Sequence, residues 1–220
     1  AAAISFSDAM IGRLIDKIKN SSYADNTIIV LWSDHGMHMG EKENIEKFTL
    51  WERSTRVPLI LSYPKMIKPG LRCDQPVSLM DIYPTLVELT GYEKPDHLDG
   101  KSLVPQIEDP SLLTSPVISS YQFSWTEKPY AAHAVRSMNH RYIYYPDIGL
   151  EELYDHQIDH NEWFNVAYKP ENKKIIENHR KVLLEMLPEL TWNNQIPEGY
   201  IIDYKGNINV MNYSELSVLN

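Results

Sequence analysis

An aspartate and a histidine stand next to each other where a run of apolar residues ends. The run covers residues 27–32, and Asp34, His35 and Gly36 follow it closely. Carboxylate and imidazole groups are both metal ligands, and ligand sites in α/β sheets lie beyond the carboxyl ends of strands. Glycine lets the backbone turn sharply or approach a bound ion. This pattern alone has two interpretations: a metal site, or an aspartate satisfied within a turn beside a solvent-facing histidine.

A lysine farther along the chain supplies a positive charge. Residues 33–56, the site loop, form a long polar connection that contains Lys47, and connections of this length inside compact domains are usually functional. A metal ion at Asp34 and the ammonium group of Lys47 would together form a pocket for an anion of the sulfate or phosphate type. A lone lysine is more often a solvated surface group, so these residues leave the interpretation open.

The elements that must position these residues are typical of an α/β fold. Apolar residues at helical spacing predict an amphipathic helix over residues 3–20. The run at 27–32 lacks alternation, as expected of a strand that is covered on both faces. A second short strand is predicted over residues 57–61, and Pro58 places it near a strand start or a sheet edge.

A capping box predicts the next helix. Ser78 and Asp81 have the spacing of an N-cap residue and its N3 partner. Pro84 suits the first turn of a helix, and Gly91 suits the position just past its end. We therefore expect a helix that ends at Thr90.

From about residue 117 the sequence changes to short strand-like runs separated by turns. These runs are residues 117–121, 131–137 and 141–145. The segment 137–141, Ser-Met-Asn-His-Arg, joins two of them as a hairpin, and an amphipathic helix is predicted over residues 170–187. The pattern predicts a small antiparallel sheet accompanied by a helix.

The composition limits the class of partner. The chain has 220 residues, of which 43% are hydrophobic, and a net charge of -9. This is enough apolar material for a sizeable core, and the negative charge argues against nucleic acid or an anionic membrane as the main partner. The longest apolar run is too short for a membrane span. Cys73 is the single cysteine, so no internal disulfide can form.

Several motifs, in order and at characteristic spacing, resemble the formylglycine-dependent sulfatases of the alkaline phosphatase superfamily. The apolar run is followed by Ser-Asp-His-Gly at 33–36, Met-Gly-Glu at 39–41, Lys47, and Arg-Val-Pro-Leu at 56–59. The similarity continues through residues 77–86, 98–103 and 152–155. Met39 replaces the usual leucine, and His160 replaces a usual proline. The segment Leu-Asp-Gly-Lys-Ser-Leu at 98–103 is most similar to the iduronate-sulfatase-like branch, which includes bacterial polysaccharide sulfatases.

The resemblance implies a fold and a division of the chain. Residues 1–115 would be the C-terminal part of an alkaline-phosphatase-like α/β sandwich domain. Residues 116–220 would be a small C-terminal α+β subdomain, with an antiparallel sheet and a helix.

The resemblance also implies roles for individual residues. Asp34 and His35 would be ligands of a calcium ion, and Lys47 would be the catalytic residue that binds the sulfate group. Candidates for substrate contact are His38, which lies in the site loop, and His133 and Arg136, which lie in the small sheet. For each of these candidates the alternative is an ordinary structural position.

The two predicted ligands, a carboxylate and an imidazole, favour different metals. Calcium prefers oxygen ligands, whereas an imidazole favours zinc. The stretch Ser-Asp-His-Gly-Met at 33–37 also resembles the zinc site of phosphodiesterases and phosphatases in the same superfamily. A zinc phosphoesterase is therefore the alternative function, while the long site loop with Lys47 favours a calcium sulfatase.

The family's nucleophile is a formylglycine made from the first residue of a C/S-x-P/A-x-R motif, and this chain lacks that motif. Cys73 and Ser62 stand in other contexts. We therefore expect a processed or truncated polypeptide that supplies part of an active site and is inactive without the N-terminal part of the same protein. A non-catalytic fragment or pseudo-enzyme is a further alternative.

The expected substrate of the full-length enzyme is a sulfated small molecule or glycan. The resemblance implies a hydrolase that removes sulfate from a carbohydrate. It also implies a location in the periplasm, outside the cell or in lysosomes.

Overall fold

The first part of the chain is built around a short pair of strands. A computed structural model describes residues 2–123, 130–190, 192, 200–202 and 208–210. Strands β1 (Ile29–Trp32) and β4 (Leu59–Ser62) form a two-stranded antiparallel sheet in which Leu31 lies opposite Ile60. The predicted strands are thus confirmed, and Pro58 directly precedes β4 as expected.

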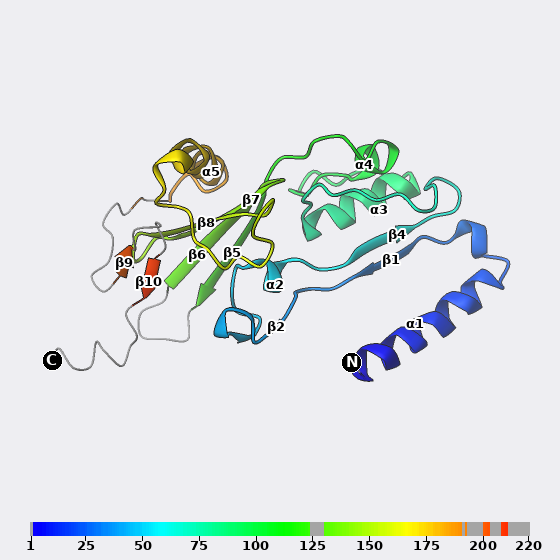
Figure 1. Ribbon diagram of the computed structural model, residues 1–220. Helices are drawn as coiled ribbons and strands as arrows, with labels where there is room; N and C mark the ends of the chain where they lie inside the picture. The colour runs from blue at the N-terminus through cyan, green and yellow to red at the C-terminus, as the bar shows by residue number, and fades with distance from the viewer. Residues whose placement is uncertain (1, 124–129, 191, 193–199, 203–207, 211–220) are drawn as a thin grey trace.

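Helices flank this pair of strands. Helix α1 (Ala2–Lys19) runs along one side, and α3 (Ile82–Thr90) and α4 (Val104–Glu108) lie on the other (Figure 1). The predicted N-terminal helix is confirmed as α1, but none of its residues is buried. Trp32 at the end of β1 is 51% exposed. The described residues therefore do not cover both faces of β1.

The predicted capping box is present at the start of α3. The N–H of Ser78 donates to Asp81 Oδ2 (2.9 Å), and the N–H of Met80 donates to Ser78 Oγ (3.2 Å). These bonds satisfy free donors at the start of the short 3-10 turn Leu79–Asp81, which leads directly into α3. Gly91 ends α3 in the left-handed conformation, with φ 74°.

The second part of the chain contains a four-stranded antiparallel sheet, the small sheet. Its strands follow one another in the order β5 (Val117–Phe123), β6 (Tyr130–Arg136), β7 (His140–Tyr145) and β8 (Leu150–Asp155). The predicted hairpin between β6 and β7 is confirmed, since the N–H of Ser137 donates to the carbonyl of His140 (2.9 Å). The predicted helix over 170–187 is a 3-10 turn (Pro170–Asn172) followed by α5 (Lys173–Met186).

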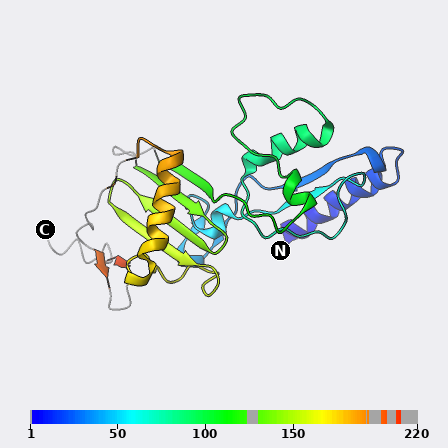
Figure 2. The same ribbon diagram turned by 90° about the horizontal axis from the view of Figure 1, so that it is seen from above.

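The small sheet is covered on both faces. Helix α5 crosses one face (Figure 2), where Ile176 and Leu183 pack against β6, β7 and β8. On the other face, Leu50 of the site loop packs against Ala132, Ala134, Ile143 and Tyr154. The site loop therefore forms part of the core of the small sheet.

The remaining elements are short. The site loop contains the hairpin of β2 (His38–Met39) and β3 (Ile45–Glu46), with the 3-10 turn Glu41–Glu43 between them, and then α2 (Glu52–Thr55). A 3-10 turn (Ala24–Asn26) follows α1, and β9 (Tyr200–Ile202) pairs with β10 (Ile208–Val210). Among the described residues, no helix has the length and apolar character needed to cross a membrane.

Gly100 offers a test of the packing around the capping box. A Cβ at this buried position would lie 2.1 Å from the carbonyl oxygen of Met80. Gly100→Ala should therefore lower the free energy of unfolding by about 1–3 kcal/mol, because backbone atoms must shift. Gly12→Ala is the control, since its Cβ meets nothing within 4 Å. Urea denaturation of both variants measures the effect, and equal stabilities would contradict this packing.

Candidate active site

The structure brings together the Asp34–His35 pair and Lys47. His35 Nε2 lies 3.5 Å from Asp34 Oδ2. Lys47 Nζ lies 2.7 Å from the same nitrogen. Asp34 and His35 come from the start of the site loop and Lys47 from its second half, yet their side chains form one polar group. The structure therefore shows the juxtaposition that the sequence predicts for an anion pocket.

The hydrogen bonds of His35 identify its acceptor nitrogen. An ammonium group only donates, so Nε2 accepts from Lys47. The other ring nitrogen, Nδ1, therefore carries the proton and donates it to the carbonyl of Gly36 (2.7 Å). A backbone carbonyl on one ring nitrogen is the usual way in which a metal-ligating histidine is oriented.

The donor set of this pair fits a divalent cation. Asp34 offers a carboxylate whose side chain is 83% exposed, and its Oδ1 is fixed by the N–H of His35 (3.0 Å). His35 offers the Nε2 lone pair, which accepts a hydrogen bond from Lys47 here and would exchange that bond for the ion. These two ligands do not complete a coordination shell, because calcium takes six to eight oxygen ligands and zinc four ligands.

Gly36 is required by packing against α2. Its N–H donates to the carbonyl of Ser54 (2.7 Å), and a Cβ at this position would lie 2.0 Å from the carbonyl oxygen of Arg53. Any larger residue would push the loop away from α2. Helix α2 therefore sets the position of the backbone that carries His35.

His38 is a fully buried residue of the site loop. Its Nε2 lies 2.8 Å from Thr49 Oγ1, and its ring meets Trp51 edge-on, with 5.8 Å between the ring centroids. Its Nδ1 has no hydrogen-bond partner among the described residues. These contacts join the two ends of the loop, and substrate contact by His38 stays a prediction.

His133 and Arg136 lie on β6, in different surroundings. His133 Nδ1 lies 2.8 Å from Ser120 Oγ on β5, and burial lowers the pKa of His133. Arg136 lines an open cavity of about 1010 Å³, whose lining also includes Asp34. The structure thus places Arg136, but not His133, on the same cavity as Asp34.

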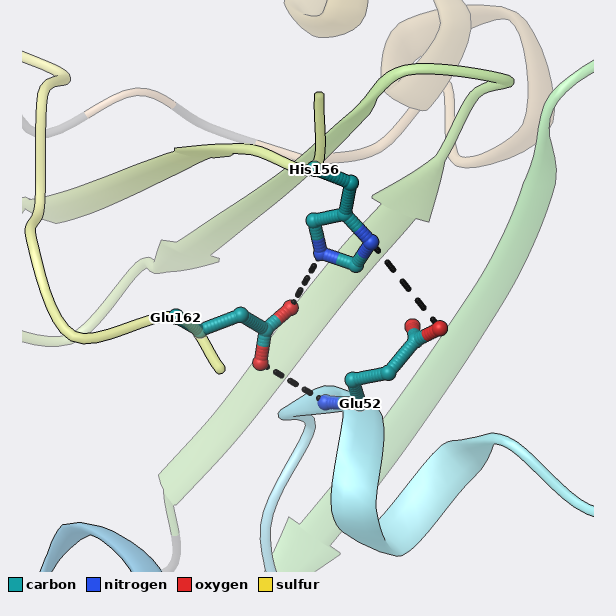
Figure 3. Close-up of side chains that lie close together, drawn as sticks. All are labelled: Glu52, His156 and Glu162. Carbon is teal, nitrogen blue, oxygen red and sulfur yellow. Dashed lines mark hydrogen bonds and ion pairs between the residues drawn. The ribbon is translucent and has the colours of Figure 1, made fainter. Parts of the chain in front are cut away.

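A buried group of charged residues joins α2 to the small sheet. This ionic cluster consists of Glu52, Arg136, Arg141, His156 and Glu162. Arg141 donates from Nη2 to Glu52 Oε2 and from Nε to Glu162 Oε1 (2.7 Å). Glu162 also accepts from the N–H of Glu52 (2.7 Å) and lies 2.8 Å from His156 Nε2 (Figure 3). The cluster fixes both the side chain and the backbone at the start of α2.

Glu52, His156 and Glu162 could by distance alone hold a metal ion, because one ligand atom from each lies within 4.8 Å of the others. The carboxylates are, however, already matched by guanidinium groups, since Arg136 Nε lies 3.2 Å from Glu52 and Arg141 bonds both glutamates. Burial alone would raise the pKa of Glu52, but Arg141 and Arg136 hold it at about 2. The trio is therefore best described as part of an ion-pair network.

A second group, the lysine–aromatic cluster, fastens the site loop to β8. It consists of Lys42, Trp51, Glu152 and Tyr154. Lys42 Nζ lies 4.4 Å from the ring centroids of Trp51 and Tyr154, and it donates to the Tyr154 hydroxyl (2.9 Å). Burial lowers the pKa of Lys42, although the nearby carboxylates of Glu152 and Glu162 oppose this shift. Such cation–π contacts strengthen when water is excluded.

The residues of both clusters, apart from Arg136, are additions to the site predicted from sequence. The sequence offers one signal for them, which is the presence of charged residues inside otherwise apolar strands. Arg141 precedes Tyr-Ile-Tyr-Tyr, and Glu151 and Glu152 precede Leu-Tyr. Charged residues are rarely buried unless they are paired.

Comparison with known proteins gives consistent matches. A family model described as Sulfatase matches residues 1–92. A curated protein named Sulfatase from Formosa agariphila is 40% identical over 216 residues, covering 94% of this chain and 40% of that protein. An N-acetylglucosamine-6-O-sulfatase from Bacteroides thetaiotaomicron is 33% identical over 189 residues, covering 83% of this chain and 33% of that protein.

Solved structures agree with these matches. One is a protein in complex with its substrate D-glucosamine-2-N,6-O-disulfate, with a TM-score of 0.71, 29% identity, and coverage of 83% of this chain and 38% of that one. Another is a 2-O GAG sulfatase, with a TM-score of 0.72, 26% identity, and coverage of 80% of this chain and 39% of that one. The predicted fold class is thereby confirmed. This chain spans at most 40% of the length of these four proteins.

The ionic cluster should make stability depend on acid pH. The pKa of Glu52 lies at about 2, below its ordinary value of 4.5, so its contribution is complete above about pH 4.5 and is lost as the pH falls toward 2. Urea unfolding between pH 6 and 2 should show this loss in the native protein. In Glu52→Gln the loss should be smaller, because residue 52 no longer titrates. Parallel pH profiles for the two proteins would contradict the assignment.

Proposed function

Because this chain belongs to the sulfatase family, we propose that the full-length protein is a sulfuric ester hydrolase acting on a sulfated carbohydrate. The observation that carries the proposal is the contact between Lys47 and His35, beside the carboxylate of Asp34. This group combines a cationic donor with a metal-ligand pair. A carbohydrate substrate is supported by the N-acetylglucosamine-6-O-sulfatase relative and by the neighbour that binds a sulfated glucosamine.

Lys47 has the role of anion binding. Its ammonium group would donate a charge-assisted hydrogen bond to a sulfate oxygen. That bond orients the ester and offsets the negative charge on the sulfate group as the reaction proceeds. The overall hydrolysis breaks the bond between sulfur and the ester oxygen. Water supplies the oxygen that stays on sulfur and the proton that the alcohol takes.

The family is metal-dependent, and Asp34 and His35 are the residues that would hold the ion. We propose calcium, with zinc as the alternative because of the imidazole ligand. When bound, the cation supplies charge stabilisation and a template for the sulfate group. The remaining ligands and the formylglycine are proposed to come from the rest of the full-length protein, because this chain spans at most 40% of the compared relatives.

Several finer expectations stay predictions. Arg136 shares a cavity with Asp34, which supports substrate contact, and its guanidinium also pairs with Glu52 in the ionic cluster. His38 and His133 have structural hydrogen bonds that account for their positions equally well. The iduronate-sulfatase-like branch, the boundary at residue 115 and a location outside the cytoplasm also stay predictions.

Removal of the Lys47 ammonium tests the proposal most directly. Lys47→Ala in the full-length protein should lower turnover of 4-nitrophenyl sulfate by about 100-fold or more, because a preorganised donor to the sulfate oxygens is lost. Lys68→Ala is the matched control, since Lys68 is an exposed lysine outside the site loop. Near-normal turnover in Lys47→Ala would refute the role of Lys47.

The metal and the reaction class are tested together. After chelation, the full-length protein should lose sulfatase activity and regain it with calcium rather than with zinc. Asp34→Asn should weaken the response to calcium, because a neutral amide replaces one charged ligand. Recovery with zinc alone, together with faster cleavage of 4-nitrophenyl phosphate than of the sulfate, would instead support a zinc phosphoesterase.

A further inference from the structure

We infer that Glu162 is a positioning residue that holds the site loop, and with it Lys47, in its working geometry. Glu162 lies outside the loop, beyond the end of β8, and among the described residues its hydrogen bonds go to groups other than Lys47 and His35. Its contacts nevertheless reach the loop on both sides of Lys47. This inference rests on the proposed function and adds a residue that acts at a distance.

Glu162 is almost completely buried, and both carboxylate oxygens and the backbone carbonyl accept hydrogen bonds. Its exposed fraction is 1%. One carboxylate oxygen meets Arg141 and His156, and the other accepts the N–H of Glu52. Its backbone carbonyl accepts from the ammonium of Lys42. One residue thus contacts the loop before Lys47, through Lys42, and after it, through Glu52.

Arg141 attaches the part of the site loop that follows Lys47 to the small sheet. Its Nη1 donates to the carbonyl of Leu50 (2.9 Å), while its Nε holds Glu162. Leu50 is itself buried against the small sheet. Lys47 therefore lies between Lys42 and Leu50, which are both fixed, and the intervening backbone has limited room to move.

The backbone conformations show that this attachment holds strained residues. Glu162 has φ 59°, a left-handed value that residues other than glycine rarely adopt. Lys42, its partner, has φ 54°, and Glu46, directly before Lys47, has φ 83°. Strained residues persist only where the surrounding contacts determine them. When the Glu162 contacts weaken, the segment before Lys47 should relax to an ordinary conformation.

Glu162→Gln in the full-length protein tests the inference, and Glu151→Gln is the matched control. Glu151 is also a buried glutamate of the second part of the chain, but its partners are Arg180 and Tyr142, away from the site loop. Both changes remove one buried charge from an ion pair. Only the first removes a charge that holds the loop.

Hydrogen exchange gives a readout that does not depend on activity. In Glu162→Gln the amides of Gly36, Gly40 and Thr49, which are hydrogen-bonded within the loop or to α2, should exchange about 10-fold faster. In Glu151→Gln they should keep their native rates. Lys42→Met, which keeps the unbranched apolar part of the side chain and removes the ammonium, should give the same loosening if Glu162→Gln does not fold.

Steady-state kinetics complete the test. Turnover of 4-nitrophenyl sulfate should fall by about 100-fold in Glu162→Gln, mainly in kcat, because a misplaced Lys47 loses alignment. The inference is overturned if loop exchange and kcat in Glu162→Gln match those of Glu151→Gln. If the loop loosens but Lys47→Ala keeps full activity, the attachment stands and the proposed function fails.

Discussion

The buried pairing of Glu52 with Arg141 is the interaction on which the rest of the structure depends. Both side chains are largely removed from water, with exposed fractions of 13% and 3%. Loss of one partner from such a pair commonly costs about 3–5 kcal/mol, because the other charge is left buried and unmatched. The pair joins α2 to β7, so it holds the first part of the chain against the small sheet. The ionic cluster thereby sets where the site loop must lie.

From this junction the geometry of the candidate site follows step by step. Helix α2 presents the carbonyls of Arg53 and Ser54 to Gly36, which must be glycine to approach them. Gly36 in turn offers its own carbonyl to His35 Nδ1. The ring is then held with Nε2 toward Asp34 and Lys47. The orientation of the Asp34–His35 pair is thus set by contacts that lead back, through α2, to the small sheet.

The sequence predicts those parts of the molecule that local patterns encode. The capping box of Ser78 and Asp81, the end of α3 at Gly91 and the hairpin after Arg136 each depend on neighbouring residues, and all are confirmed. The juxtaposition of Asp34, His35 and Lys47 was reached through motif order and spacing, and the structure shows it. Their metal-binding and catalytic roles stay predictions.

The ionic cluster could not be predicted in this way. Glu52 and Arg141 lie 89 positions apart, and Glu52 and Glu162 lie 110 apart. Hydrophobic periodicity carries no information about such pairs. Strand β8 was not predicted, for a related reason. Its Glu151 and Glu152 are charged residues, which are typical of a surface, yet both are buried. Their carboxylates accept hydrogen bonds from Arg180, Trp51 and Tyr154, which come from other parts of the chain or from β8 itself.

The ionic cluster between α2 and the small sheet fixes the orientation of the site loop, which apolar packing would not do. Buried ion pairs add little net stability compared with well-packed apolar residues of similar volume, so stability alone does not explain five ionisable residues in one enclosed place. Hydrogen bonds have direction, however, and those of Arg141 and Glu162 fix the orientation of the loop as well as its contact with the sheet. Apolar packing would allow small rotations and shifts. The anion-binding role proposed for Lys47 requires a donor that is aligned as well as near, and a directional junction suits a loop that carries such a donor.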